Sequence, residues 1–319
     1  MLKRLAFTLL LIPLSGYAGS EQTATEQTEA VAWLEKMGVA LREESYAGTF
    51  IYMRGPRFDT MQVVHQFKEG EEFERLTNIS GAAREIIRHD EHAVCLHAGN
   101  DSSVPHALPR GPFTQSFNRN LVENLSNYNI GLHGVGRIAN RPTIRISISP
   151  KNRDRYGYRL WLDQKTGLLL RSNLVNNGRV LELFQFTDIS IEKTIAAELL
   201  TASIVGEDVF EHELLTVENV LAEAATQQPP TWKVNWMPRG FRQVSAPNGG
   251  GMVFTDGVAT LSVFIEKRGN SLGDVQTTVG GTVVLSRPIE GSLEQITVVG
   301  EVPLDTAKRV AESVKPVIY

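Results

Sequence analysis

Three histidines and the only cysteine of the chain lie close together in the sequence, at His89, His92, Cys95 and His97. Imidazole and thiolate groups are preferred zinc ligands in proteins. On a β-strand, however, Cys95 and His97 would share one face while His92 points to the other, and no second ligand pair at zinc-finger spacing follows. The pattern favours a turn and a half-buried strand over a metal site, so we expect no metal and no cofactor.

The other chemistry-bearing residues form no catalytic motif. Gly131, Gly134 and Gly136 are not spaced like a dinucleotide fingerprint, and no βαβ pattern follows them, so we expect a loop there. The sequence has no G-x-S-x-G elbow, no H-E-x-x-H pair and no phosphate-binding loop. Asp163 and Asp256 precede turns, where aspartate has a conformational role. These patterns favour a binding protein, and a hydrolase with a dispersed site is the minor alternative.

Two groups of residues, mostly aromatic, are the candidates for binding. The first group fits either the lining of an apolar lipid cavity or an ordinary core, and consists of Phe50, Tyr52, Trp161, Phe184 and Phe186. The second group surrounds a Pro-Arg-Gly turn and fits either a seam for a partner peptide or the core of a small domain. It consists of Trp232, Trp236, Arg239 and Phe241.

These residues require a β-rich scaffold, and Tyr156–Ile189 shows it most clearly. Tyr158, Leu160 and Leu162 alternate with other residues, which predicts a strand with one buried face. Gly167 ends a short loop where a positive φ is expected, and Asn177-Gly178 predicts a two-residue hairpin turn. The last run, Arg179–Ile189, is apolar on both faces, so protein or a ligand must cover each of them.

The remaining pattern predicts one helix followed by an antiparallel meander. Glu29–Glu44 has apolar residues at helical spacing. Strands are expected at Ser45–Arg54, Met61–Lys68, Phe73–Leu76, Arg84–His89, Ala93–His97 and Pro142–Ser149. Between the last two, Ala98–Gly136 is too long for an ordinary connector and suggests a lid or binding loop with a helical patch.

The first eighteen residues have the features of a cleaved secretory signal. Lys3-Arg4 precedes the apolar run Leu5–Leu14, and Gly16-Tyr17-Ala18 supplies a cleavage site. We therefore expect a periplasmic protein in which 19–28 is a loose segment. The chain has 32 basic and 36 acidic residues, which argues against nucleic acid as a general partner. A single cysteine excludes an intramolecular disulfide.

Composition divides the mature chain into two units. We expect a first domain at 29–193, a partly helical linker at 194–230 that ends in Gln-Gln-Pro-Pro, and a small α+β domain at 231–319. In the small domain, strands are expected at Met252–Thr255, Val258–Lys267, Thr282–Ser286 and Gln295–Val299. A last helix can begin after Pro303.

Four long strings, in order, resemble the RseB/MucB family: GYRLWLDQKTGLLLRSNLV (157–175), VLELFQFTDI (180–189), DGVATLSVFIEK (256–267) and ITVVGEVPLDTAKRVAESV (296–314). The similarity extends over nearly the whole mature chain. It implies an α+β fold in which an unclosed antiparallel β-barrel over helices, like that of LolA and LolB, precedes a smaller C-terminal domain.

The resemblance also implies a role. Members of this family regulate the sigma-E envelope stress response by binding the periplasmic domain of a membrane anti-sigma factor, which shields it from site-1 proteolysis. Lipopolysaccharide or a related acyl-chain lipid is expected to release them. The alternative is a periplasmic lipid or lipoprotein carrier that uses the barrel cavity. The family offers no catalytic signature to transfer. An exposed cavity would also make a homo-oligomer plausible.

Overall fold

A computed structural model describes residues 18–90, 92–98, 122–192, 194–204, 209–214, 232–244, 251–267 and 274–317. The predicted signal peptide, apart from Ala18, lies outside these residues. Residues 99–121, which hold most of the lid or binding loop expected at Ala98–Gly136, also lie outside them. Within the described part, no helix combines the length and the apolar character needed to cross a bilayer.

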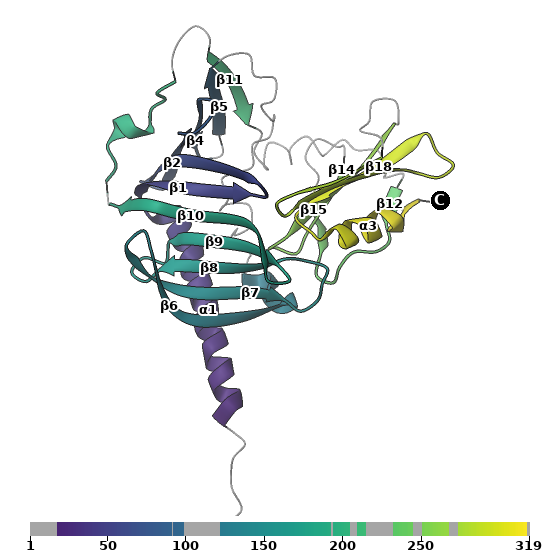
Figure 1. The fold of residues 1–319 in the computed structure, drawn as a ribbon, viewed down its shortest axis with the longest axis horizontal. Coiled ribbons are helices and arrows are strands. Elements are labelled where there is room, and N and C mark those ends of the chain that lie inside the picture. Colours follow the sequence, from purple (N-terminus) through teal and green to yellow (C-terminus); the bar gives the residue numbers. More distant parts are fainter. Residues whose placement is uncertain are drawn as a thin grey trace, which may run out of the picture.

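A curved antiparallel sheet of eleven strands forms the first part of the molecule (Figure 1). Its strand order is β11-β5-β4-β3-β2-β1-β10-β9-β8-β7-β6, so among the described strands β11 and β6 are the two ends of the sheet and do not pair with each other, and the barrel is unclosed. The strands are β1 Tyr46–Arg54, β2 Arg57–Lys68, β3 Glu71–Asn78, β4 Arg84–His89, β5 His92–Ala98, β6 Tyr128–Ile138, β7 Arg141–Pro150, β8 Gly157–Asp163, β9 Leu169–Asn176, β10 Arg179–Ile191 and β11 Val209–Leu214.

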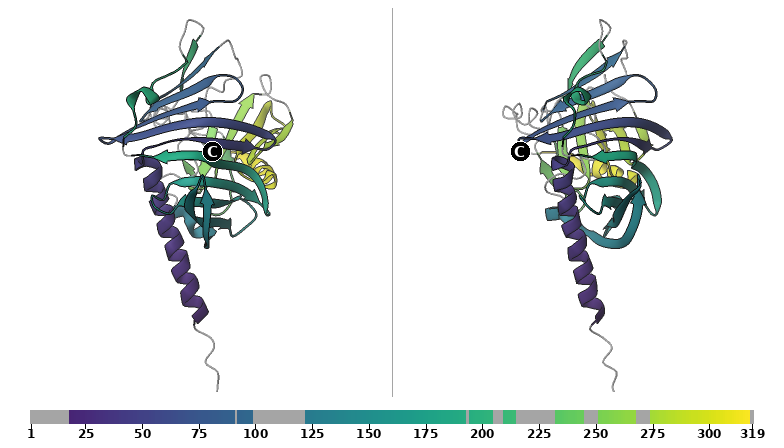
Figure 2. Two further views of the ribbon diagram at one scale, coloured as in Figure 1. Left: turned by 60° about the vertical axis from the view of Figure 1, so that its left-hand side comes forward. Right: turned by 90° about the vertical axis from the view of Figure 1, so that its left-hand side faces the viewer.

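Helix α1, Ala18–Glu43, supplies the second layer and extends past the sheet at its N-terminal end (Figure 2). Ala30, Leu34 and Met37 lie at helical spacing and are fully buried in one core with the sheet residues Phe50 and Leu160. The prediction of a loose segment over 19–28 was wrong, because this segment is the first part of the helix. Residues 19–28 are mostly polar, so they show no apolar period from which a helix could be predicted.

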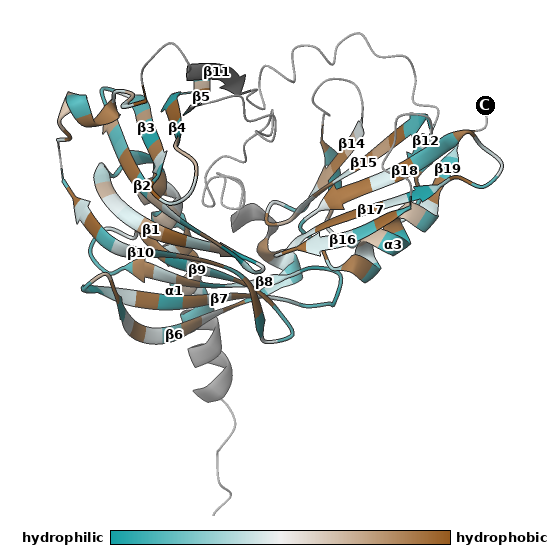
Figure 3. Cartoon of the chain, turned by 45° about the horizontal axis from the view of Figure 1, so that its top comes forward, coloured by the Kyte–Doolittle hydropathy of each residue, from teal (hydrophilic) through white to brown (hydrophobic). Residues whose placement is uncertain are grey.

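The strand and the turns predicted within Tyr156–Ile189 are confirmed. Tyr158, Leu160 and Leu162 are buried on one face of β8. Gly167 has a φ of 88°, and Asn177 and Gly178 have φ values of 48° and 81°, as a type I′ turn requires. Alternating hydrophobic and hydrophilic residues along the strands are visible in Figure 3.

Two connecting segments differ from the prediction. The glycines Gly131, Gly134 and Gly136 lie in the edge strand β6 rather than in a loop, and a bulge between Leu132 and Val135 interrupts its pairing with β7. A short 3-10 helix, η1 (Val122–Asn127), precedes β6.

The expected linker is also partly structured. The segment 194–204 contains a short 3-10 helix, η2 (Ala197–Leu200). This segment contacts the large sheet, because the Arg75 guanidinium donates a hydrogen bond to the Leu199 carbonyl at 3.1 Å. Strand β11 then pairs with β5. The large sheet therefore continues beyond residue 193, and the position of the domain boundary stays a prediction.

The C-terminal part is the smaller α+β domain that was expected. Its six-stranded sheet has the order β13-β14-β15-β18-β17-β16, and β12 pairs with β19 beside it. The elements are β12 Trp232–Val234, β13 Arg242–Val244, β14 Gly251–Thr255, β15 Thr260–Lys267, β16 Val275–Val279, β17 Thr282–Pro288, β18 Glu294–Gly300, α3 Leu304–Ser313 and β19 Val314–Pro316. Helix α3 begins after Pro303 and buries Ala307, Val310 and Ala311 in a second core with the sheet.

Candidate interdomain site

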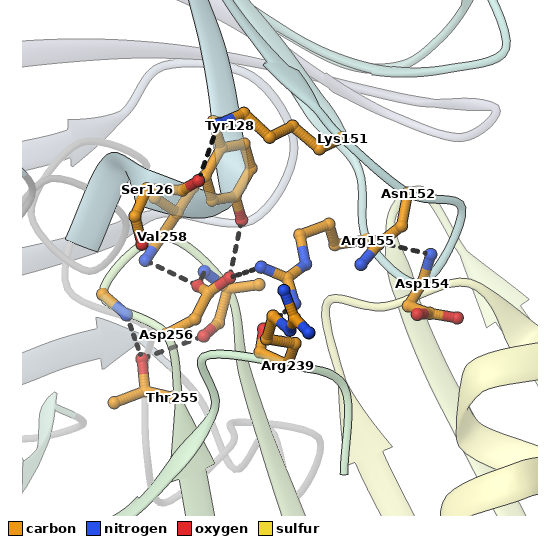
Figure 4. Close-up of polar contacts among 12 residues, drawn as sticks. Ser126, Tyr128, Lys151, Asn152, Asp154, Arg155, Arg239, Thr255, Asp256 and Val258 are labelled. Atoms are coloured by element: carbon orange, nitrogen blue, oxygen red, sulfur yellow. Dashed lines mark hydrogen bonds and ion pairs between the residues drawn. The ribbon is translucent and has the colours of Figure 1, made fainter.

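A fully buried ion pair joins the two parts of the molecule. The Arg155 Nη1 atom lies 2.8 Å from the Asp256 Oδ2 atom, and both side chains have 0% exposure (Figure 4). Arg155 comes from the β7–β8 loop and Asp256 follows β14 in the C-terminal domain. Removal of one partner would leave a buried charge without compensation, which is strongly destabilising.

The Asp256 carboxylate is held by further donors. The Tyr128 hydroxyl donates to Oδ2 at 2.8 Å, while the backbone N–H groups of Val258 and Ala259 donate to Oδ1 at 3.0 and 2.8 Å. Burial and the neighbouring Asp256 carboxylate raise the pKa of the Tyr128 hydroxyl, so this group remains a donor. Asp256 thus combines the expected turn role with an ionic role between the domains.

Arg155 is also held by neutral groups of both parts. Its Nη2 donates to the Arg239 carbonyl. Its guanidinium carbon lies 5.5 Å from the centre of the Tyr128 ring and 5.2 Å from that of Phe241. A guanidinium is weakly hydrated and stacks on aromatic faces, which makes arginine suited to such a buried position.

A second polar contact lies at the ends of β1 and β10. The Glu182 carboxylate accepts hydrogen bonds from the Tyr52 hydroxyl and from the Gly281 backbone N–H, the latter at 2.8 Å. Arg54 donates to the Thr282 hydroxyl, and its Nε lies 3.5 Å from Glu182 Oε1. The β16–β17 turn is therefore bound to the rim of the large sheet.

Glycine is required at the tip of this turn. Gly280 has a φ of 59°, and a Cβ atom there would lie 2.5 Å from Glu182 Oε1. A Cβ atom on Gly281 would lie 2.1 Å from the Leu174 Cδ2 atom. The tip of the turn, Gly280-Gly281, thus approaches the large sheet more closely than any larger residue allows.

The β18–α3 connection makes the third contact. The Tyr156 hydroxyl donates to the Val302 carbonyl at 3.0 Å, and the Tyr158 hydroxyl donates to Glu301 Oε2 at 3.4 Å. The Thr306 hydroxyl donates to the Asp154 carbonyl at 3.0 Å. Burial, followed by the nearby Glu182 carboxylate, raises the pKa of Glu301. Two carboxylates therefore face each other across the interface.

The candidates for the lipid cavity lie in three different environments. Phe50, Phe184 and Phe186 are buried and contact one another, with ring centres 4.9 to 5.9 Å apart. Tyr52 belongs to the interdomain contact. Trp161 lies on the other face of β8, where the Arg171 guanidinium covers its ring at 4.4 Å. The assignment of a lipid cavity to these five residues stays a prediction.

The candidates for the partner peptide are also divided. Arg239 and Phe241 contact Arg155 at the interdomain site. Trp232 lies opposite Pro316 in the β12–β19 pair, and Trp236 lies under the Arg309 guanidinium at 3.9 Å. All three aromatic residues pack against the core of the C-terminal domain. Their role in binding a partner remains a prediction.

The histidine–cysteine cluster is divided by the sheet. Cys95 and His97 are buried on β5, and His89 is exposed at the end of β4. Among the described residues, the donor atoms close enough to share an ion belong to the exposed group Glu71, His89 and Asp90, which includes only one of the four residues weighed in the sequence.

Sequence reasoning missed most of the interdomain residues. Arg155, Tyr128 and Glu182 belong to no motif, and their partners lie far away in the chain. Two signals were available. A turn aspartate two residues after Phe254 was present at Asp256, and adjacent glycines at 280–281 marked a close backbone approach.

The fold and the interdomain site together define a two-domain protein in which a small α+β domain is fixed to the rim of an unclosed β-barrel. Family models described as the MucB/RseB N-terminal domain and the MucB/RseB C-terminal domain match residues 29–204 and 226–315. The chain belongs to the MucB/RseB family.

Individual relatives cover almost the whole chain. The sigma factor AlgU regulatory protein MucB of Pseudomonas aeruginosa is 34% identical, with 92% of this chain and 93% of the relative covered. The sigma-E factor regulatory protein RseB of Haemophilus influenzae is 27% identical, with 98% of both covered. The solved Pseudomonas aeruginosa MucA/MucB complex contains a chain that matches with a TM-score of 0.71 at 32% identity, covering 91% of this chain and 100% of that one. A structure of MucB in complex with MucA(peri) gives a TM-score of 0.70.

Proposed function

We propose that this protein is a periplasmic negative regulator that binds the periplasmic domain of a membrane-bound anti-sigma factor of the MucA/RseA type. The observation that carries the proposal is the similarity to MucB chains solved together with MucA, which extends through both domains. A regulator of this kind needs a stable binding surface rather than a catalytic group, and the relatives are named as regulatory proteins.

The interdomain contacts support this function physically. Three buried or half-buried polar contacts hold the domains in one arrangement, so residues from both can form a single preorganised surface. Arg239 and Phe241 lie where such a surface would cross the interface. Binding of the anti-sigma segment there would remove it from the reach of the site-1 protease and keep the sigma factor sequestered.

Release by lipopolysaccharide or a related lipid is the second part of the proposal. The unclosed barrel has an apolar inner face that is packed against α1, so an acyl chain would enter by displacing part of this packing. The C-terminal domain is bound to the rim of that same barrel. A lipid that enters at the rim would compete with the interdomain contacts and disturb the surface that both domains build. The alternative function, a lipid or lipoprotein carrier, uses the barrel alone.

The proposal is tested by a titration of the mature protein with the periplasmic segment of the cognate anti-sigma factor. We expect saturable binding, slower cleavage of the segment by its site-1 protease, and weaker binding when lipopolysaccharide is added. An unchanged cleavage rate at saturating protein would contradict regulation. Lipid binding without any affinity for the segment would favour the carrier.

A matched pair of variants locates the surface. Phe241→Ala should weaken binding of the segment, whereas Phe58→Ala should not, because Phe58 is an exposed aromatic on β2, outside the interdomain site. Equal affinity of both variants would remove Phe241 from the partner surface. Urea unfolding of each variant shows whether a loss of binding reflects a loss of fold.

A further inference from the structure

A hollow of about 400 Å³ lies on the large sheet, between the β7–β8 loop and the β9–β10 turn. Ser147 of β7 and Arg159 of β8 lie opposite each other in its floor. They alternate along their strands with the buried core residues Ile146, Ile148 and Leu160. The floor of the hollow is therefore on the sheet face that points away from the core shared with α1.

The charge of this hollow is strongly one-sided. Among the described residues that line it, four are cations, namely Lys151, Arg153, Arg155 and Arg159, and none is an aspartate or glutamate. Serine hydroxyls, asparagine amides and the backbone of the turn at Gly178 supply most of the remaining lining. Such a surface repels metal cations and offers little to an acyl chain, but it suits a compact anion.

Two of the four cations are already engaged. Arg155 is paired with Asp256, and the Lys151 ammonium donates to the Ser126 carbonyl at 2.9 Å. Arg153 and Arg159 are exposed, and neither forms an ion pair with a described carboxylate. Asp154 belongs to the same loop but does not line the hollow. The unpaired positive charge is thus concentrated where Arg153 and Arg159 border the hollow.

We propose that this hollow is a binding site for a phosphate-class oxyanion, either free phosphate or a phosphate monoester carried by a larger molecule. Arg153 and Arg159 would provide forked, charge-assisted hydrogen bonds, and Lys151 a third positive charge. The Ser147 hydroxyl is engaged with the His133 ring at 2.7 Å, so Ser149 and Asn176 would supply the neutral donors of the lining. A phosphate monoester carries about −1.5 to −2 charges at pH 7, which the two unpaired guanidinium groups can balance.

The site would also be connected to the interdomain contacts. Arg155 lines the hollow and at the same time forms the buried pair with Asp256 (Figure 4). Because the Arg155 side chain is fully buried, an anion bound in the hollow would act on this guanidinium through its charge rather than by direct contact. The hollow does not include Arg239 or Phe241 of the proposed partner surface. Binding of an anion in the hollow can therefore be measured without the anti-sigma factor.

The experiment is a calorimetric titration of the mature protein with inorganic phosphate at low salt, repeated with dodecyl phosphate below its micelle concentration. The test variant is Arg153→Gln combined with Arg159→Gln. The control is Arg137→Gln, which removes an exposed arginine from β6 outside the hollow. Arg155 is left unchanged because its loss would break the interdomain pair.

We expect saturable phosphate binding that the double variant weakens by at least about tenfold and that the control leaves unchanged. Tighter, equally arginine-dependent binding of dodecyl phosphate would identify a monoester headgroup as the source of the anion, and a preference for inorganic phosphate would identify the free anion. Absence of saturable binding of both probes, or equal affinity in the double variant with an unchanged urea midpoint, would overturn the proposal.

Discussion

At the scale of single residues, buried ionic groups define how the two domains are joined. Asp256 is the clearest case, because one carboxylate oxygen closes its own turn and the other accepts from Tyr128 and pairs with Arg155. Such a group costs solvation energy on burial, and only the full set of partners offsets this cost. The residue is therefore intolerant even of a nearly isosteric change.

Asp256→Asn should lower the free energy of unfolding by about 3–5 kcal/mol, because it leaves the buried Arg155 guanidinium without a counter-charge. Urea unfolding measures the change. Asp274→Asn, an exposed aspartate before β16, serves as the matched control and should unfold like the wild type. Combining Asp256→Asn with Arg155→Met should recover part of the loss, and a double variant no more stable than Asp256→Asn alone would contradict the ionic explanation.

Glu85 gives the chain a defined acid sensitivity. Burial raises the pKa of this carboxyl, but hydrogen bonds from Ser203, Arg75 and Ile204 outweigh burial and lower the pKa to about 2. A depressed pKa in the folded state stabilises the fold above the unfolded pKa, and this stabilisation is lost as the pH falls from about 4.5 to about 2. Urea midpoints across that range should therefore fall less steeply for Glu85→Gln than for the wild type. If the urea midpoints of both proteins changed equally with pH, the low pKa of Glu85 would be contradicted.

At the scale of elements, short-range chemistry determined which segments could be predicted. The Asn177-Gly178 turn and the alternation in β8 depend on neighbouring residues, and both were predicted correctly. Strand β6 was missed because its glycines resemble a loop, and it is a strand only because β7 pairs with it. The start of α1 was missed for a similar reason, since polar residues carry no periodic signal.

Helix α1 contains a position that can be improved. Gly38 is exposed on the helix, and no atom lies within 4 Å of a Cβ atom built there. Gly38→Ala should raise the free energy of unfolding by about 0.5–1 kcal/mol, because alanine loses less backbone entropy in a helix. Chemical denaturation measures the change. A destabilised variant would show that this face of α1 needs the small residue for another reason.

At the scale of the whole molecule, the interdomain site was beyond sequence reasoning. Arg155, Glu182 and Gly281 acquire their roles only when two separate cores are placed together. The fold class and the family followed from local patterns and from long similar strings. The glycines at 280–281 indicate a close backbone approach, but no local pattern tells which part of the chain they approach. For the same reason, only Arg239 and Phe241 of the four residues predicted to bind a partner peptide lie at the interdomain site.

Gly281→Val should uncouple the two cores. The new side chain would occupy the position of the Leu174 methyl group and push the β16–β17 turn away from Glu182. By scanning calorimetry we expect one transition for the wild type and two for the variant, since each core would then unfold separately. Thr278→Val, an exposed change on β16, should keep the single transition. One unchanged transition in Gly281→Val would show that the turn does not couple the cores.

The buried pair has a consequence for a protein divided into fragments. If the chain were cut between Leu214 and Trp232, the first fragment would present Arg155 at its new surface and the second Asp256 and Glu301. Opposite charges would then guide two halves back to the arrangement they have in one chain. Fragment complementation should therefore succeed, with both halves eluting together in gel filtration. A second fragment carrying Asp256→Lys should elute alone, and co-elution of that fragment would show that the pair does not direct assembly.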